Sequence, residues 1–207
     1  MSCSDSEASI RSLKGKRSPV LTISITAVFT ALVFVITQFA WVPISAVPGQ
    51  RFDAGDIIIF IAAWTFGPMV GGFAGGVGSS LSDALVGGAP YWPFTLIIKG
   101  LEGTIAGLAY RRISRSRLLL SWLLAGAVMV GGYFLTNVVF LGLIVGVNSS
   151  LNPGLIGGLL EVPFDIAQVV AGGIVGRSVA RYLKSAFPSL VQRSGGVPAT
   201  SEKMTKT

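Results

Sequence analysis

Pro93-Phe-Thr-Leu-Ile-Ile-Lys-Gly-Leu-Glu-Gly-Thr-Ile-Ala-Gly-Leu108 is the stretch of sequence that decides the fold. It predicts a hydrophobic helix that begins at a proline, a residue favoured in the first helical turn. Lys99 and Glu102 interrupt the apolar run and lie one turn apart on one face. In a membrane each such charge costs roughly 2.5 to 3.5 kcal/mol at the bilayer centre, so it faces protein or a watery cavity. The pair is therefore a candidate for a buried site.

Small residues form stripes on this helix and on the apolar run before it. The neighbouring face of residues 93–108 carries Gly100, Gly103 and Gly107. The run 69–86 has two stripes with a period of four residues: Gly71, Gly75 and Ser79, and Gly72, Gly76 and Ser80. Such stripes let helix backbones approach closely in a membrane. We interpret the glycines as packing surfaces and not as a phosphate-binding loop.

The composition indicates an all-α, polytopic membrane protein. Of 207 residues, 51% are hydrophobic and 12% are charged, and the mean hydropathy is +0.71. The chain has no histidine, and its one cysteine, Cys3, lies in a polar N-terminal segment. An internal disulfide is therefore excluded, and we expect no zinc, no haem and no other cofactor.

The basic residues are clustered and do not form a surface for nucleic acid. Fourteen of the sixteen fall in three groups: Arg11, Lys14, Lys16 and Arg17; Arg111, Arg112, Arg115 and Arg117; and Arg177, Arg181, Lys184, Arg193, Lys203 and Lys206. Each group follows or precedes an apolar run. The positive-inside rule places all three in the cytoplasm, and we expect no nucleic-acid partner.

Six apolar runs define the expected organisation: residues 20–41, 57–66, 69–86, 93–108, 118–147 and 154–179. The first run is too long for the apolar part of a signal peptide. Because even numbers of crossings must separate the basic clusters, we predict a six-transmembrane-helix bundle with both termini cytoplasmic. Residues 1–18 are expected to be a disordered cytoplasmic tail, residues 19–184 the transmembrane substrate-binding domain, and residues 185–207 a polar cytoplasmic tail.

The second run is the shortest, and its flanks carry structural signals. Gly67 and Pro68 predict a break between it and the next run. Asp53 and Asp56 lie just before the start of this run, and we interpret them as N-terminal caps of its helix. Residues 43–52, which contain two prolines and a glycine, are expected to be an outside loop.

Polar residues occur at similar depths in three of the expected helices. At about 1.5 Å per residue from the outer helix ends, Lys99, Asn137 and Glu161 lie roughly 9, 15 and 10 Å deep. Glu161, Asp165 and Gln168 share one face at i, i+4 and i+7. We predict that these groups share a pocket open to the outside, because unpaired polar groups in lipid are costly. The predicted substrate-binding residues are Lys99, Glu102, Tyr133, Asn137, Glu161, Asp165, Gln168, Trp92 and Tyr91.

Two further interpretations of the same residues stay open. One is a purely structural network in which Lys99 pairs with Glu161, and the other is a proton relay. Tyr91 and Trp92 could equally be anchors at the membrane interface. Within the pocket interpretation, we expect a Lys99–Glu161 pair in the empty protein, with Glu102 or Asp165 meeting the ligand. The excess of acids over bases favours a ligand with donor groups or positive charge.

Several motifs together resemble a known family. They are Asp53-Ala-Gly-Asp56-Ile-Ile-Ile-Phe, Phe66-Gly-Pro-Met-Val-Gly-Gly, Ser82-Asp83 and Pro93-Phe-Thr-Leu-Ile-Ile-Lys-Gly-Leu-Glu-Gly. In this order they resemble the membrane S components of energy-coupling-factor (ECF) vitamin transporters, especially the riboflavin-type group. The resemblance extends over most of residues 20–184, and Lys-Gly-Leu-Glu-Gly is its most specific part.

The resemblance implies a six-helix protein of the cell membrane that captures a vitamin in an outward pocket. A transmembrane T component and two ATPase subunits would then drive uptake. The family docks on its T component through an Ala-x-x-x-Ala pattern, which Ala27 and Ala31 match here. The chain has no phosphate-binding motif of its own, so its partners would hydrolyse ATP. Riboflavin is the first expected ligand, and thiamine or its hydroxymethylpyrimidine precursor is the second.

Two other function classes compete with this expectation. A self-sufficient ion-coupled carrier would favour internal repeats, and none is visible in the sequence. A membrane enzyme is disfavoured because no histidine, no plausible cysteine nucleophile and no serine with a nearby base is found. We therefore expect a transport subunit and not an enzyme.

Overall fold

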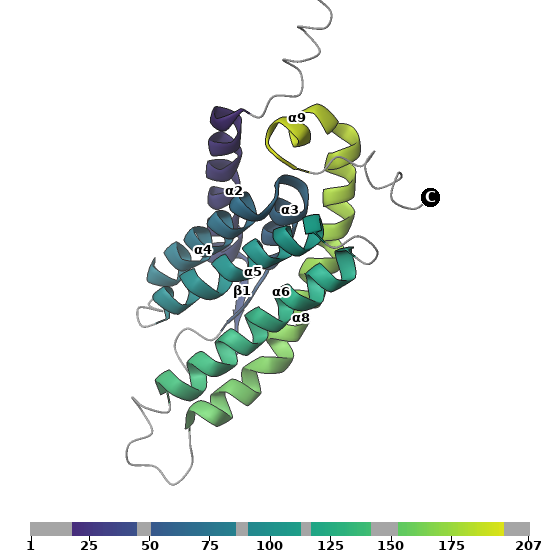
Figure 1. Cartoon of the computed structure of the whole chain (residues 1–207). Helices are drawn as coiled ribbons and strands as arrows, with labels where there is room; N and C mark the ends of the chain where they lie inside the picture. Colours follow the sequence, from purple (N-terminus) through teal and green to yellow (C-terminus); the bar gives the residue numbers. More distant parts are fainter. Residues whose placement is uncertain (1–17, 45–50, 86–90, 113–116, 142–152, 197–207) are drawn as a thin grey trace, which may run out of the picture.

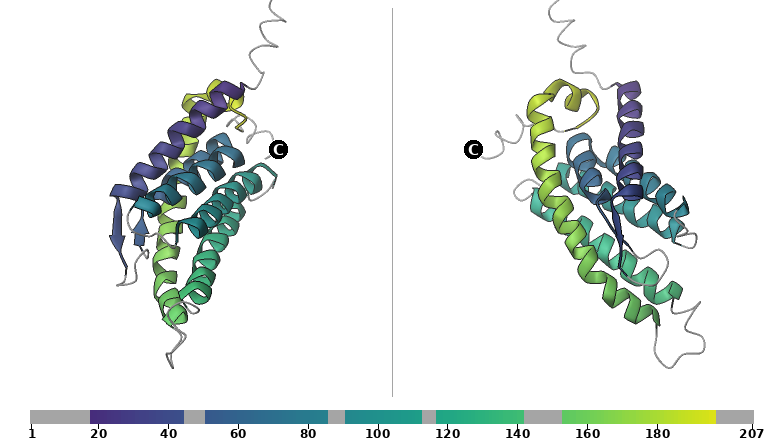
Figure 2. Two further views of the ribbon diagram at one scale, coloured as in Figure 1. Left: turned by 90° about the vertical axis from the view of Figure 1, so that its left-hand side faces the viewer. Right: turned by 180° about the vertical axis from the view of Figure 1, so that it is seen from behind.

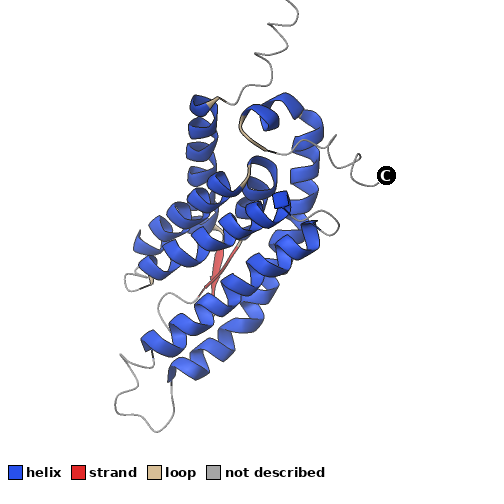
Figure 3. Cartoon of the chain, viewed as in Figure 1, coloured by secondary structure: helices blue, strands red, loops and turns tan. Residues whose placement is uncertain are grey.

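The computed structural model describes residues 18–44, 51–85, 91–112, 117–141 and 153–196. Within these ranges the chain is mainly helical (Figures 1 and 3). The helices are α2 (Pro19–Phe39), α3 (Gly55–Phe66), α4 (Pro68–Leu85), α5 (Trp92–Arg112), α6 (Arg117–Thr136), η1 (Asn137–Leu141), α8 (Pro153–Ala186) and α9 (Pro188–Arg193). Most of the expected N-terminal tail, much of the turn before Pro93, the centre of the middle basic loop, the end of the fifth apolar run and the last residues of the C-terminal tail lie outside the described residues.

Within the described residues, three helical segments are long and apolar enough to cross a membrane: Pro19–Phe39, Leu118–Phe140 and Gly154–Ala186. The first has 21 residues, and at about 1.5 Å per residue it matches the roughly 30 Å hydrocarbon thickness. The second apolar run, α3, has only 12 residues. Almost all of α3 is buried, so it is an inner helix around which the longer helices pack.

The break predicted between the second and third runs is present. Gly67 ends α3 with a φ of 104°, a left-handed conformation that favours glycine, and Pro68 begins α4. The Gly67 amide hydrogen-bonds to the carbonyls of Ala62 and Ala63, which closes the last turn of α3.

The glycine stripes bring α4 and α5 into close contact, as predicted. A Cβ placed on Gly103 would lie 2.9 Å from the backbone nitrogen of Gly72, and one on Gly76 would lie 2.8 Å from the carbonyl oxygen of Leu96. Atoms at these distances overlap, so only glycine permits this helix separation. In Figure 1 the two helices run side by side. This packing places Lys99 of α5 against the inner helix α3.

A short hairpin replaces part of the expected outside loop. Strand β1 (Trp41–Pro43) pairs antiparallel with β2 (Arg51–Asp53), and Trp41 lies opposite Asp53. The first helix therefore ends at Phe39, two residues earlier than the apolar run suggests. Figure 2 shows the strands from behind, between α2 and α8. The hairpin brings Arg51 and Asp53 next to the polar residues of the bundle.

The described flanks of the three basic clusters meet at one end of the molecule. The Ser18 amide donates to the Arg193 carbonyl at 3.0 Å, and the Arg111 guanidinium donates to the carbonyls of Gly195 and Phe66. Figure 1 shows the start of α2 close to α9 at this end. The described flanks of the three clusters are therefore neighbours in the folded chain.

Helix α9 lies in the segment 185–207 that was expected to be a polar tail. Val191 of α9 is fully buried and packs in one cluster with Ala62, Phe66 and Val70. The folded bundle thus continues beyond residue 184 to about residue 196. The sequence signal that was overlooked is the apolar pair Leu190-Val191 directly after Pro188.

Candidate functional site

A polar cavity lies among β2, α4, α5, α6 and α8, with Thr37 of α2 also in its wall. It is small, about 20 Å³ in volume, which is room for roughly one water molecule. The lining brings together six of the predicted substrate-binding residues: Tyr91, Lys99, Tyr133, Glu161, Asp165 and Gln168. Of the groups placed at similar depth, Lys99, Glu161 and Asp165 line the cavity, whereas Asn137 of the fifth run does not. A ligand larger than water must move side chains to enter.

Lys99 is the buried cation at the centre of the site. Its ammonium forms an ion pair with Asp56 and a second one with Glu102 at 3.3 Å. All three side chains are nearly inaccessible to solvent, and such charges are tolerated only when paired. The prediction that Lys99 pairs with Glu161 was wrong. Helix α3 packs beside α5, and its Asp56 forms the ion pair with Lys99 instead. The interpretation of Asp56 as a simple cap was also wrong, because its carboxylate accepts from Lys99.

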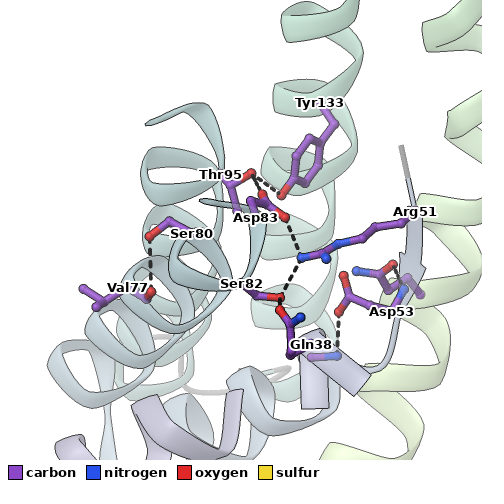
Figure 4. Close-up of polar contacts among 11 residues, drawn as sticks. Gln38, Arg51, Asp53, Val77, Ser80, Ser82, Asp83, Thr95 and Tyr133 are labelled. Atoms are coloured by element: carbon purple, nitrogen blue, oxygen red, sulfur yellow. Dashed lines mark hydrogen bonds and ion pairs between the residues drawn. The ribbon is translucent and has the colours of Figure 1, made fainter. Parts of the chain in front are cut away.

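Arg51 is the second cation at the pocket, and it is held by a chain of polar groups (Figure 4). Its guanidinium pairs with Asp83 at 2.5 Å and donates to Ser82 at 3.1 Å. The other carboxylate oxygen of Asp83 accepts from Thr95, whose hydroxyl in turn accepts from Tyr133 at 3.3 Å. The chain links the hairpin to α4, α5 and α6. It therefore fixes one wall of the pocket.

A third group joins the loop before α5 to α6 and α8. The Tyr91 hydroxyl donates to the Asn137 side chain at 3.3 Å, and the Asn137 amide donates to Glu161. Asn137 begins η1, a single turn of π-helix. Such turns are rare and are often found at functional sites. Here the wider turn directs the fully buried Asn137 toward Glu161 of α8.

Asp53 and Asp165 are two acids of the site that form no ion pair with Lys99 or Arg51 among the described residues. Asp53 lies at the end of β2, where its carboxylate accepts from the Gly55 amide at 2.7 Å and its own amide donates to Gln168 at 3.0 Å. Burial raises the pKa of Asp53 to about 6, although the positive charge of Lys99 acts in the opposite direction. Asp165 is 3% exposed, and its Oδ2 has no hydrogen-bond partner within the described part of the chain. An oxygen left in this state inside a pocket is a candidate ligand contact.

The remaining predicted residues lie beside the pocket or outside it. Glu102 is fully buried behind Lys99 and does not line the cavity. Asn137 connects two lining residues, Tyr91 and Glu161, without lining the cavity itself. Trp92 is 43% exposed and does not line the cavity, which fits its alternative interpretation as an interfacial anchor.

The residues of the site that were missed from the sequence include five that carry its ion pairs and hydrogen bonds: Arg51, Asp53, Asp56, Asp83 and Thr95. Three more cavity-lining residues were also missed: Thr37, Ser79 and Met129. Asp53, Asp56 and Asp83 stand in the motifs that carry the family resemblance, which was the signal available for them. Arg51 lies in the segment interpreted as a loop, and its role depends on the hairpin. Sequence spacing within one helix cannot reveal such partners.

The two alanines matched to the docking pattern lie on the outer face of α2. Ala27 and Ala31 are exposed, as are Ser24 and Val28 around them. Nothing in the described bundle covers this face. Small exposed side chains at this spacing permit a close helix crossing.

Comparisons with known proteins give a consistent result over most of the chain. Residues 18–185 match the family model described as "ECF-type riboflavin transporter, S component". An uncharacterized protein of Pyrococcus woesei is 40% identical over 162 residues, which is 77% of this chain and 99% of that protein. The thiamine precursor transporter HmpT of Lactococcus lactis subsp. cremoris is 31% identical over 173 residues, which is 84% of this chain and 89% of HmpT.

A solved structure supports the fold independently. The S component of a bacterial ECF transporter superposes with a TM-score of 0.57 at 23% sequence identity, covering 80% of this chain and 96% of that one. The identity is too low to transfer a ligand. The likeness therefore concerns the arrangement of the helices.

Proposed function

The chain belongs to the ECF-type riboflavin transporter S-component family, and from this premise we propose that it captures a small, donor-rich vitamin precursor in the polar pocket among α5, α6 and α8. The family consists of membrane subunits of vitamin transporters and not of enzymes. The chemistry of the pocket then selects among vitamins. The ligand we favour is an aminopyrimidine, of the kind from which thiamine is built.

The charges around the pocket support this choice. Six buried carboxylates surround the site: Asp53, Asp56, Asp83, Glu102, Glu161 and Asp165. Two cations lie among them, Arg51 and Lys99, and both are already paired with carboxylates. The surplus of acceptors suits a ligand that brings hydrogen-bond donors or a positive charge. An aminopyrimidine has an exocyclic amino group and a ring nitrogen that can be protonated.

The single observation that carries the proposal is the state of Asp165. Its buried Oδ2 has no hydrogen-bond partner among the described residues although it faces the pocket with Glu161 one turn away. A donor group of the ligand would satisfy this oxygen, and a buried acceptor left without a partner costs about 1 to 3 kcal/mol. Tyr133 also lines the cavity, with its ring 5.7 Å from the Lys99 ammonium, and offers a flat surface for a heterocycle.

Riboflavin is the second candidate, and the description of the family model favours it. Tyr91 and Tyr133 could stack on its larger ring system. Its greater size would demand a much larger rearrangement of a cavity of about 20 Å³. Its hydroxyls could also donate to the carboxylates of the lining, so the argument against it is size and not hydrogen bonding.

The same proposal includes the topology and the partners. We place the protein in the cell membrane with six spans and both termini in the cytoplasm, because the basic clusters meet at one end. A T component would dock across Ala27 and Ala31, and two ATPase subunits would supply the energy. The exposure of both alanines on α2 supports this docking face.

The experiment that tests the proposal is identification of the bound ligand. The full chain is purified in mild detergent without its partners, denatured, and the released small molecules are identified by mass spectrometry. We expect an aminopyrimidine in wild-type protein and its loss in Asp165→Asn. A flavin in the wild-type sample would establish the second candidate, and a lipid-soluble or inorganic ligand would overturn vitamin capture.

A further inference from the structure

A second cavity lies at the opposite end of α2 from the hairpin, between the start of α2 and α9. It is open and has a volume of about 360 Å³. Its walls come from two segments far apart in sequence: Ser18, Val20, Leu21 and Ser24 on one side, and Ser189, Leu190 and Arg193 on the other. It shares no residue with the vitamin pocket.

The groove is a fixed part of the fold because hydrogen bonds join its two walls. The Ser18 amide donates to the Arg193 carbonyl at 3.0 Å, and the Thr22 hydroxyl donates to the Ser194 carbonyl at 3.4 Å. Behind α9, fully buried Val191 anchors the short helix on the bundle. The two walls therefore keep their separation when the groove is empty.

The lining divides into a polar end and an apolar side. Arg193 is exposed, and its guanidinium makes no hydrogen bond or ion pair with any described residue. The hydroxyls of Ser18 and Ser189 lie in the same lining, which contains no acidic residue. Val20, Leu21 and Leu190 form the apolar side, and Val20 is 73% exposed. One basic group beside hydroxyls, next to an apolar strip, matches an anionic headgroup with an attached acyl chain.

The groove also lies at the level where a membrane surface is expected. The apolar span of α2 begins at Pro19, directly after Ser18. Two exposed aromatic residues lie at this end, Tyr182 in the last turns of α8 and Phe187 between α8 and α9, and aromatic side chains gather at membrane interfaces. Only 17% of the most apolar window of α2 is buried within the bundle. Lipid is therefore the natural neighbour of this helix.

We propose that the groove between α2 and α9 binds a phospholipid with an anionic headgroup, the phosphate against Arg193 and one acyl chain along Val20 and Leu21. A phospholipid fits better than a protein segment because the groove combines a single charge with an apolar strip at the membrane boundary. This inference is independent of the vitamin ligand. It concerns the other end of the helices and a different class of molecule.

The test is lipid retention by the full chain in native mass spectrometry, with dioleoyl-phosphatidylglycerol and dioleoyl-phosphatidylcholine added in equal amounts to the detergent-purified protein. One basic residue near a membrane surface contributes about 1 kcal/mol, so we expect phosphatidylglycerol to be retained about fivefold over phosphatidylcholine. Arg193→Gln should remove this preference, and Arg193→Lys should keep most of it. Arg181→Gln is the matched control, since Arg181 is equally exposed but lies outside the groove.

A variant that fills the groove tests whether the lipid binds inside it or is attracted only by the charge of the surface. Ser189→Trp places a large side chain at an exposed lining position, and we expect it to reduce retention of both lipids while thermal unfolding stays unchanged. Equal retention of the two lipids by wild type would overturn the proposal. So would an equal loss in Arg181→Gln and Arg193→Gln, or full phosphatidylglycerol retention in Ser189→Trp. Loss of T-component assembly in Arg193→Gln with unchanged lipid retention would assign the groove to a protein partner instead.

Discussion

The pairing of Lys99 can be tested by a double-mutant cycle. Lys99→Met keeps much of the length of the side chain but removes its charge, which leaves Asp56 and Glu102 buried without their cation. Removing one partner of a buried pair costs roughly 3 to 5 kcal/mol. We expect a loss of unfolding free energy in this range, because neither carboxylate is accessible to water.

The cycle identifies which acid is the partner. Combining Lys99→Met with Asp56→Asn should give a coupling energy above about 1.5 kcal/mol, since the second substitution removes the stranded charge. Combining it with Glu161→Gln should give less than about 0.5 kcal/mol, because Glu161 accepts from Asn137 instead. Unfolding is followed by tryptophan fluorescence in mixed detergent and dodecyl sulfate micelles. A larger coupling with Glu161 than with Asp56 would refute the arrangement.

Three further predictions address packing, pH and topology. Gly103→Val should separate α4 from α5 and destabilise the protein by several kcal/mol. Gly131→Ala should be nearly neutral, because nothing lies within 4 Å of the added Cβ. Similar unfolding curves for the two variants would contradict the glycine packing. Because the folded pKa of Asp53 is about 6 against an ordinary 3.8, its contribution to stability is present below pH 4 and is lost as the pH rises through 6. Wild type should therefore lose roughly 3 kcal/mol more than Asp53→Asn over this range, and parallel pH profiles would argue against the shift. In a Cys3→Ser background, Ser114→Cys and Thr200→Cys should react with an impermeant maleimide only after cells are opened, and labelling of intact cells would refute the cytoplasmic placement.

Helix boundaries could be predicted from the sequence where they depend on local chemistry. Gly67 and Pro68 end one helix and begin the next whatever surrounds them. The glycine stripes of the third and fourth runs likewise predict close packing, since no other residue type allows it. The short helix α9 was missed because six residues carry too weak a periodic signal against a polar background.

The site was predictable in its location and less so in its contacts. Depth along the helices placed Lys99, Glu161 and Asp165 in the outer half of the bundle, and the structure brings them to one cavity. Depth alone cannot choose between acids at similar levels on different helices, so the partner of Lys99 was assigned wrongly. Asp56 lies on a helix too short for the depth argument. Arg51 reaches the pocket because it lies on a hairpin, and the two prolines in this segment had led us to predict a loop.

The central claim is that the isolated chain binds a donor-rich heterocycle through Asp165. The most direct measurement is isothermal titration calorimetry of the purified full chain, freed of any bound ligand, with 4-amino-5-hydroxymethyl-2-methylpyrimidine and, separately, with riboflavin. We predict one-to-one binding of the aminopyrimidine, weakened about 10- to 100-fold in Asp165→Asn, because the substitution replaces an acceptor oxygen with an NH₂ group that cannot accept the ligand's donor. Binding of riboflavin alone, or equal affinity of wild type and Asp165→Asn for the aminopyrimidine, would contradict it.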